Sequence, residues 1–430
     1  MNRFWTACSV FAILFIGFSH ILLAAEYSLN SSVALEAEHD DNIRLSVDNV
    51  QSRFGVTADV VTKTGVKAET WNALFKVRLA LHDFSRSGHD SDDQSATFAL
   101  NKRLERHSIN LDSRYTRDST RSSEEFESGR FSDIRRQSAS LSPSWRYSVT
   151  ERHSVSLNMT LSTVDYASDD YTGDDTFSSF IEWSYVASDT LSLFLRANQS
   201  RSETDGRKGT HQFIRTIPFE VSLVEQTFII DNDSDGYQLG VQYYPVEQLS
   251  LFGLFGRTGV QSAYTVSDDE DVCELTAGEL GFISRGICDL EGQSSRNGMT
   301  TARATWEEAR FNIGVSYSLQ SKTNSEGFLY EYETIDASWN YMISEADNLS
   351  LVATWSENET INVPKGQLSR DDNDREYLSI SARYDHRLSD RWKLGFTYRY
   401  RWQQRESENS SANSNAVLIN FTYQSQKNIW

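Results

Sequence analysis

The sequence has few cysteines and prolines, a minority of positive charges and, beyond its first residues, no long apolar run. Lysine and arginine number 41 against 61 aspartate and glutamate, so the formal net charge is −20 over 430 residues. Because a phosphate backbone is bound through clustered positive charge, this balance argues against a nucleic-acid-binding protein. After residue 25 no segment reaches the roughly 18 apolar residues that a membrane-spanning helix needs. Aromatic residues are abundant: 10 Trp, 19 Tyr and 23 Phe argue against a disordered chain.

The first 25 residues have the composition of a secretory signal peptide. Arg3 is their only charged residue, an apolar stretch covers Val10–Phe18, and small residues precede Glu26. This pattern predicts export and cleavage near Ala24 or Ala25, leaving a single domain at 26–430. The alternative is an uncleaved anchor over residues 4–25, which is just long enough to span a bilayer.

Only two cysteines follow this segment. Cys273 and Cys288 lie in a stretch rich in Gly, Ser and Asp. In an exported protein such a pair indicates a disulfide that closes one loop. Without a CxxC spacing or clustered histidines, we expect neither a metal site nor a redox pair, and the sequence indicates no cofactor.

Apolar and polar side chains alternate with a period of two along the whole mature chain. This period is typical of β-strands with one apolar and one polar face. The clearest apolar series are Trp71, Ala73, Phe75, Val77, Leu79 and Leu81; Phe311, Ile313, Val315, Tyr317 and Leu319; Ile335, Ala337, Trp339, Tyr341 and Ile343; Trp392, Leu394, Phe396, Tyr398, Tyr400 and Trp402; and Val417, Ile419, Phe421 and Tyr423. The sequence therefore predicts an all-β protein.

Two architectures can use such strands: a soluble β-sandwich and a transmembrane β-barrel. Each run covers about ten residues, the length that crosses a bilayer at a tilt and longer than common sandwich strands. Aromatic residues such as Trp71, Tyr384 and Trp392 lie near the ends of the apolar stripes, as in the aromatic girdles of outer-membrane barrels. The opposite faces carry charges that suit a water-filled lumen better than a dry core. We therefore predict an antiparallel up-and-down barrel in the bacterial outer membrane.

The connections alternate between short polar turns and long loops rich in Asp, Ser, Gly and Asn. This alternation indicates short periplasmic turns and long extracellular loops, and counting predicts about 18 strands. Sixteen is the alternative, because the strands near Phe54 and Pro143 are weakly patterned. The predicted short turns are at 62–67, 103–107, 150–153, 187–190, 246–248, 307–310, 344–348 and 388–391.

Both ends of the predicted barrel resemble features of known barrels. The segment Glu38-His39-Asp40-Asp41-Asn42-Ile43 resembles the acidic N-terminal signature of the beta-barrel porin-2 family. The resemblance implies an outer-membrane barrel associated with exopolysaccharide synthesis and export; the other interpretation is a plain acidic turn. Trp430 resembles the C-terminal signal read by the barrel-assembly machinery, although Gln424, Gln426 and Asn428 depart from its apolar alternation, so the last strand is expected to bulge or end early.

No pattern of residues indicates catalysis. The pairs His82-Asp83, His89-Asp90 and Asp385-His386 are adjacent in sequence, so in a strand their side chains point to opposite faces. No phosphate-binding loop or nucleophile elbow is present, and we expect a protein that is not an enzyme. The acidic runs 268–271 and 371–374 are expected to be solvated; the alternatives are calcium binding and divalent bridges to anionic surface glycolipid. The barrel itself is expected to contact outer-membrane lipid.

The predicted lumen is the functional surface. Arginines there could attract an anionic polysaccharide, or the charges could pair with one another across the lumen and rigidify it. The first hypothesis is a passive channel for exopolysaccharide export or diffusion of hydrophilic solutes. The second is a structural or adhesive barrel that anchors surface polysaccharide and whose lumen is plugged. The apolar loop 202–236 either folds into the lumen or extends its hairpin above the membrane. The lumen-lining candidates are Lys76, Arg78, Arg146, Glu182, Arg196, Arg303, Asp336, Arg383, Arg399 and Arg401.

Overall fold

The computed structural model describes most of the mature chain. Its backbone description covers 25–429 apart from 48–49, 86–89, 121–133, 169–172, 205–206, 217–218, 269–271, 275–282, 286–287, 324–328, 361–373, 406–409 and 426–427. Side chains are also not described at 207–216, 219–230, 262–268, 272–274, 283–285, 288–297, 322–323, 329, 360 and 428–429. The predicted signal peptide therefore lies outside the described residues except for Ala25.

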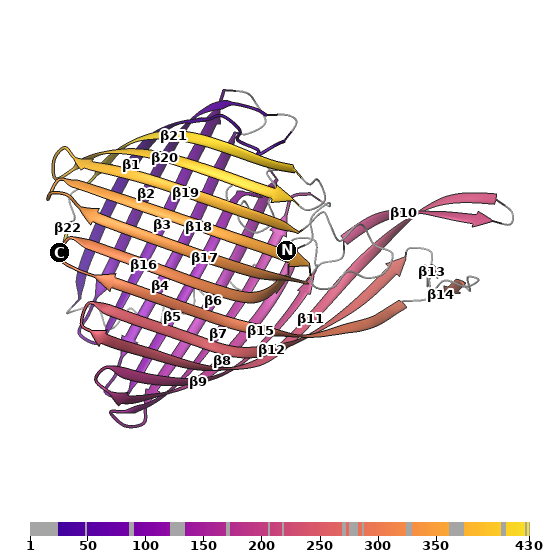
Figure 1. Ribbon diagram of the computed structural model, residues 1–430, viewed down its shortest axis with the longest axis horizontal. Coiled ribbons are helices and arrows are strands. Elements are labelled where there is room, and N and C mark those ends of the chain that lie inside the picture. Colours follow the sequence, from indigo (N-terminus) through magenta and orange to yellow (C-terminus); the bar gives the residue numbers. More distant parts are fainter. Residues whose placement is uncertain are drawn as a thin grey trace.

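The described chain folds into β-strands of up to 28 residues (Figure 1). The strands are β1 (Glu26–Asp40), β2 (Arg53–Lys67), β3 (Trp71–Phe84), β4 (Ser91–Arg103), β5 (His107–Ser119), β6 (Arg135–Ser148), β7 (His153–Tyr166), β8 (Asp174–Ser188), β9 (Leu191–Thr204), β10 (Arg207–Thr216), β11 (Phe219–Val246), β12 (Leu249–Asp268), β13 (Val272–Glu274), β14 (Ile283–Arg285), β15 (Cys288–Glu307), β16 (Phe311–Thr323), β17 (Leu329–Met342), β18 (Asp347–Thr360), β19 (Arg375–Arg387), β20 (Trp392–Arg405), β21 (Ser410–Gln424) and β22 (Asn428–Ile429).

Eighteen of these strands close into one antiparallel barrel. Each wall strand pairs with its neighbours in chain order, with β9 followed by β11 and β12 by β15. The first strand closes the ring against the last, from Ser32 opposite Gln424 to Asp40 opposite Ala416. The predicted barrel of 18 strands is confirmed, and the weakly patterned segments around Phe54 and Pro143 are the strands β2 and β6. The last long strand ends at Gln424, and the short β22 pairs with β1.

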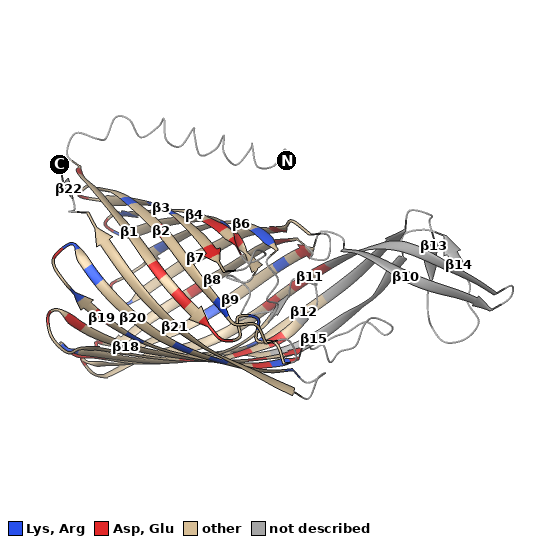
Figure 2. Ribbon diagram, turned by 90° about the horizontal axis from the view of Figure 1, so that it is seen from above, with Lys and Arg blue, Asp and Glu red and all other residues tan. Residues whose placement is uncertain are grey.

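The strand register gives the wall two chemically different faces. Most of the exposed large apolar side chains lie on the outer face, in every part of the ring, because alternate residues of paired strands share a face; Leu74 and Val352 on the inner face are exceptions. Examples are Val33, Leu35, Leu79, Leu81, Ile181, Leu195, Ile313, Val315, Ile335, Leu351, Ile380, Phe396 and Ile419. The other face carries Ser, Thr, Asn and charged residues, and Figure 2 shows basic and acidic positions interspersed along the wall. Among the described residues, no helix is long and apolar enough to cross a bilayer.

One predicted turn is wrong. The polar segment 62–67 is not a turn, because β2 continues to Lys67 and pairs with β3 as far as Asn72. Its polar residues Lys63 and Gly65 belong to the inner face, where no apolar side chain is required. The chain instead turns at 68–70, where the Ala68 amide donates to the Trp71 carbonyl over 2.8 Å. The other predicted short turns coincide with connections at one rim.

The apolar segment 202–236 forms strand rather than irregular loop. β10 and the start of β11 pair as a hairpin, from Arg207 opposite Phe228 to Thr216 opposite Phe219. β11 then continues without interruption into the wall, and Figure 1 shows this hairpin projecting from it. At the level of the backbone the segment therefore extends the wall strands.

Candidate functional site: the barrel lumen

The register places every predicted lumen-lining residue on the inner face. Within adjacent strands Glu182 lies opposite Arg196, and Arg303 lies opposite Ser316, which in turn lies opposite Asp336. Following such pairs around the ring connects Lys76, Arg78, Arg146, Glu182, Arg196, Arg303, Asp336, Arg383, Arg399 and Arg401 to a single face. This face is opposite to the one that carries the exposed apolar side chains.

Several of the arginines form ion pairs within the wall. Arg196 donates through Nε and Nη2 to one Glu182 oxygen, at 3.1 and 2.7 Å, and its guanidinium lies 4.2 Å from the Phe180 ring centroid. Arg78 Nε lies 2.8 Å from Asp59, and Arg383 Nε lies 3.0 Å from Asp385. These arginines are neutralised by neighbouring residues of the wall, whereas the alternative expected pairs across the lumen.

Other predicted residues have no ion pair within the described part of the chain. Arg146 donates to the hydroxyl oxygens of Ser154 and Ser184 at 2.8 and 3.4 Å. Asp336 accepts from the Thr354 hydroxyl at 2.8 Å. Neither Lys76 nor Arg303 forms a hydrogen bond or ion pair there. Among the predicted lumen-lining residues, some charges are therefore neutralised by ion pairs and others, such as Lys76 and Arg303, have no ion pair with a described residue.

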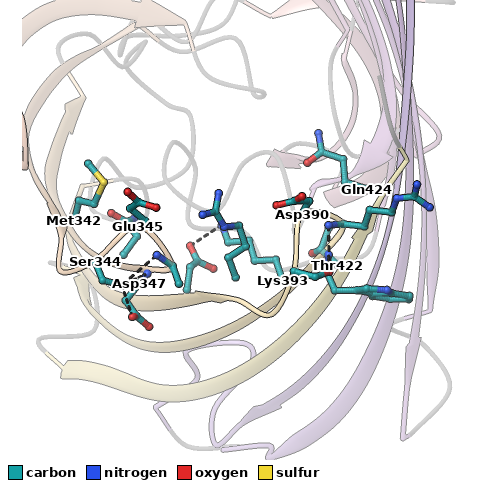
Figure 3. A pocket seen from close by; sticks show the side chains of 15 residues that line it. Met342, Ser344, Glu345, Asp347, Asp390, Lys393, Thr422 and Gln424 are labelled. Atoms are coloured by element: carbon teal, nitrogen blue, oxygen red, sulfur yellow. Dashed lines mark hydrogen bonds and ion pairs between the residues drawn. The ribbon is translucent and has the colours of Figure 1, made fainter. Parts of the chain in front are cut away.

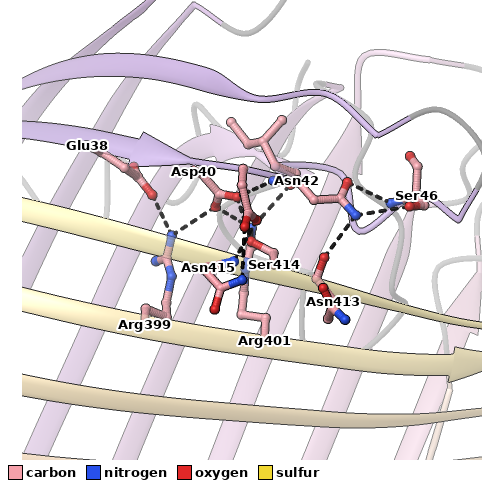
Figure 4. Close-up of polar contacts among 11 residues, drawn as sticks. Glu38, Asp40, Asn42, Ser46, Arg399, Arg401, Asn413, Ser414 and Asn415 are labelled. Atoms are coloured by element: carbon pink, nitrogen blue, oxygen red, sulfur yellow. Dashed lines mark hydrogen bonds and ion pairs between the residues drawn. The ribbon is translucent and has the colours of Figure 1, made fainter.

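A buried polar cluster joins the first strand to the last two near the rim with the long loops (Figure 4). Arg401 Nη2 lies 2.6 Å from Asp40 Oδ2, and the two side chains are 4% and 1% exposed. The Ser414 hydroxyl donates to the other Asp40 oxygen at 2.6 Å, and Arg399 pairs with Glu38 at 2.5 Å. Arg399 and Arg401 were predicted to line the lumen, whereas their role in closing the ring was not predicted.

This cluster fixes residues 41–46 against the inner wall. The Asn42 side chain donates to the Asn413 carbonyl at 3.0 Å and accepts from the Ser46 amide at 3.1 Å. Leu45, with a positive φ of 47°, is buried against Tyr377 and Ala412. Residues 38–43 thus begin inside β1 and continue as the anchored start of the connection that follows it.

A second feature lies at the rim with the short turns (Figure 3). Residues of the connections 343–346 and 388–391 line a pocket of about 360 Å³, with Lys393 3.0 Å from Asp385. Asp385 belongs to β19, and on the other face of that strand His386 Nδ1 lies 2.8 Å from Asp347. Asp385 and His386 therefore have different partners, as expected for neighbours in a strand. Among the described residues there is no cluster of three or more His, Cys, Asp or Glu that could hold a metal ion.

The predicted disulfide lies outside the described side chains. Cys273 belongs to β13 and Cys288 begins β15, and only the backbone is described at both positions. The disulfide remains a prediction.

Comparisons with known proteins concern the architecture alone. No protein-family model and no curated protein sequence matches this chain. The ferric citrate transporter FecA has a TM-score of 0.47 at 6% identity, covering 92% of this chain and 78% of its own. OpdQ from Pseudomonas aeruginosa has 0.42 at 9%, covering 94% and 98%, and OccAB4 from Acinetobacter baumannii has 0.43 at 8%, covering 95% and 100%. At these scores the likenesses carry no argument about function, so the functional conclusion rests on the barrel itself.

Proposed function

We propose that this protein is a passive outer-membrane channel for hydrophilic solutes. The observation that carries the proposal is the chemical division of the wall, with an apolar outer face around the ring and an inner face made mainly of polar and charged residues. In a bilayer a sheet must close on itself so that every backbone group is paired, and this barrel closes between β1 and β21. Eighteen-stranded barrels are wide enough to leave an aqueous channel.

An acidic exopolysaccharide is one candidate cargo of such a channel. The resemblance of residues 38–43 to the porin-2 signature suggests it, and inner-face cations without ion pairs support it chemically. To reach the outer membrane, the protein itself would need a leader, a role that the predicted signal peptide at 1–25 suits. It would also need insertion by the barrel-assembly machinery. Small hydrophilic solutes that carry carboxylates would be attracted by the same inner-face cations.

A structural or adhesive barrel is the second candidate function. The observation that favours it is the length of the strands beyond the common wall height: β11 has 28 residues and β12 and β15 have 20 each. Such hairpins could present a surface for polysaccharide or surface glycolipid. In that case the lumen would not need to conduct.

Liposome swelling separates the two candidates. Liposomes containing the refolded mature protein are placed in isotonic solutions of neutral sugars of increasing size. A channel admits small sugars quickly and larger oligosaccharides more slowly, so the swelling rate should fall smoothly with solute size. Protein-free liposomes are the control. Swelling no faster than this control, from protein shown to be folded by its heat-dependent gel mobility, would favour the anchoring barrel.

A further inference from the structure

A row of cations crosses the inner face of β2 to β5. Lys63 on β2 lies directly opposite Lys76 on β3, Lys76 lies opposite Thr97 on β4, and Thr97 lies opposite Arg114 on β5. Neighbouring strands are about 4.8 Å apart, so the three cations span about 14 Å, with the Thr97 hydroxyl between two of them. Their long side chains can reach a common ligand.

These cations are not compensated by protein groups. Lys63, Lys76 and Arg114 form no ion pair with any described residue, and Lys63 and Arg114 are exposed. The inward acid of β2, Asp59, is engaged by Arg78 at 2.8 Å. Asp112 lies on the same face as Arg114, two residues earlier, and forms no ion pair with it. Like charges directly opposite each other in a sheet repel, and an anion between them would relieve that repulsion.

The row beside these cations is apolar on β2 to β4 and ends at Asp112 on β5. Leu74 lies between Gly65 and Ala99 on the inner face and is 46% exposed, although it points into the polar lumen. A ring with an apolar face and a carboxylate at its edge would contact Leu74 with the ring while the carboxylate meets the cations. Sugar acids have this shape.

We propose that Lys63, Lys76 and Arg114 form a binding site for the carboxylate of sugar acids on the lumen wall, here called the β2–β5 shelf. The shelf deepens the proposed channel function, on which it rests, by naming a solute class and the residues that select it. Carboxylates hydrogen-bonded to ammonium and guanidinium groups are held more strongly than by neutral donors. The same chemistry fits a free uronate and a uronate unit within a polysaccharide.

The test compares two triple variants with equal loss of positive charge. The site variant is Lys63→Gln with Lys76→Gln and Arg114→Gln. The matched control is Arg106→Gln with Arg152→Gln and Arg310→Gln, whose exposed cations lie in the short turns. In planar bilayers the wild-type protein and the control should prefer chloride over potassium in a salt gradient, and the site variant should lose this preference. Galacturonate should block the site variant roughly tenfold more weakly than the wild type or the control, since charge-assisted bonds are lost. Galactose, which has no carboxylate, should block all three proteins to the same extent.

Further arms of the experiment separate the cargo and separate the shelf from the channel. Monomeric galacturonate and polygalacturonate are compared as blockers: block by both at similar uronate concentration indicates a site for the single sugar acid, and block by the polymer alone contradicts it. If neither the wild type nor any variant conducts, the proposed channel function is wrong. Calorimetry of galacturonate binding to the detergent-folded protein then tests, independently of conduction, whether the β2–β5 shelf binds the sugar acid. Equal selectivity or equal binding in the site variant and the wild type would overturn the proposal.

Discussion

Replacing Arg401 by Met should destabilise the barrel by about 3–5 kcal/mol, the largest loss expected from any single inner-face substitution. The reason is the carboxylate that the change leaves behind. Asp40 is 1% exposed, and its strongest partner is the Arg401 guanidinium at 2.6 Å. Without that partner the buried carboxylate keeps the Ser414 hydroxyl and the Asn42 amide as hydrogen-bond donors, and its remaining cation, Arg399 Nη2, is farther away at 3.8 Å. The measurement is urea unfolding of the protein in phospholipid vesicles, followed by Trp fluorescence.

The exposed pair Arg78–Asp59 supplies the matched control. Its N–O distance is similar, 2.8 Å, but its side chains are 42% and 22% exposed. Arg78→Met should therefore cost only about 0–1 kcal/mol, as exposed ion pairs do. The double variant Asp40→Asn with Arg401→Met should recover part of the stability, because the unpaired charge is gone. An equal loss in Arg401→Met and Arg78→Met would show that burial of the ring closure contributes nothing.

The same substitution at two neighbouring residues of β18 should change the stability by very different amounts. Leu351 lies on the outer face and Val352 on the inner face, with similar exposures of 38% and 43%. Leu351→Arg places a guanidinium in lipid and should cost about 2–4 kcal/mol of stability in a bilayer. Val352→Arg adds a cation to a water-filled lumen and should change the stability by less than about 0.5 kcal/mol.

The same vesicle unfolding assay measures both variants, and a detergent-solubilised sample shows how far the difference depends on lipid. Equal costs for Leu351→Arg and Val352→Arg would mean that the outer face does not meet lipid. A larger cost for Val352→Arg would mean that the inner face is dry.

The faces of the strands were predictable because they depend on a local period of two. Residues such as Ile335 and Asp336 go to opposite faces wherever the strand lies in the ring, so the inner-face set follows from parity alone. The error at 62–67 has the same origin: Lys63 and Gly65 are polar or small because they face the lumen, and that composition is also typical of turns. The error hid Lys63, and with it the row of cations that defines the β2–β5 shelf.

The ring closure could not be predicted, because its partners are far apart in sequence. Asp40 and Ser414 are 374 residues apart, and only the pairing of β1 with β21 brings them together. The sequence alone shows that Asp40, at the end of the first strand, points inward, and that Arg401 on β20 does so as well. Nothing local indicated that they meet, or that Leu45, shortly after the first strand, is buried against Tyr377.

The central claim, that the closed barrel encloses a water-filled passage, is tested most directly by single-channel conductance of the refolded mature protein in a planar bilayer. The inner face described above predicts discrete steps of current that increase linearly with voltage and with salt concentration, since charged and hydroxyl groups line the passage. Protein that inserts and is folded, yet passes no current at any voltage in concentrated salt, would contradict the claim and leave a barrel with an occluded lumen.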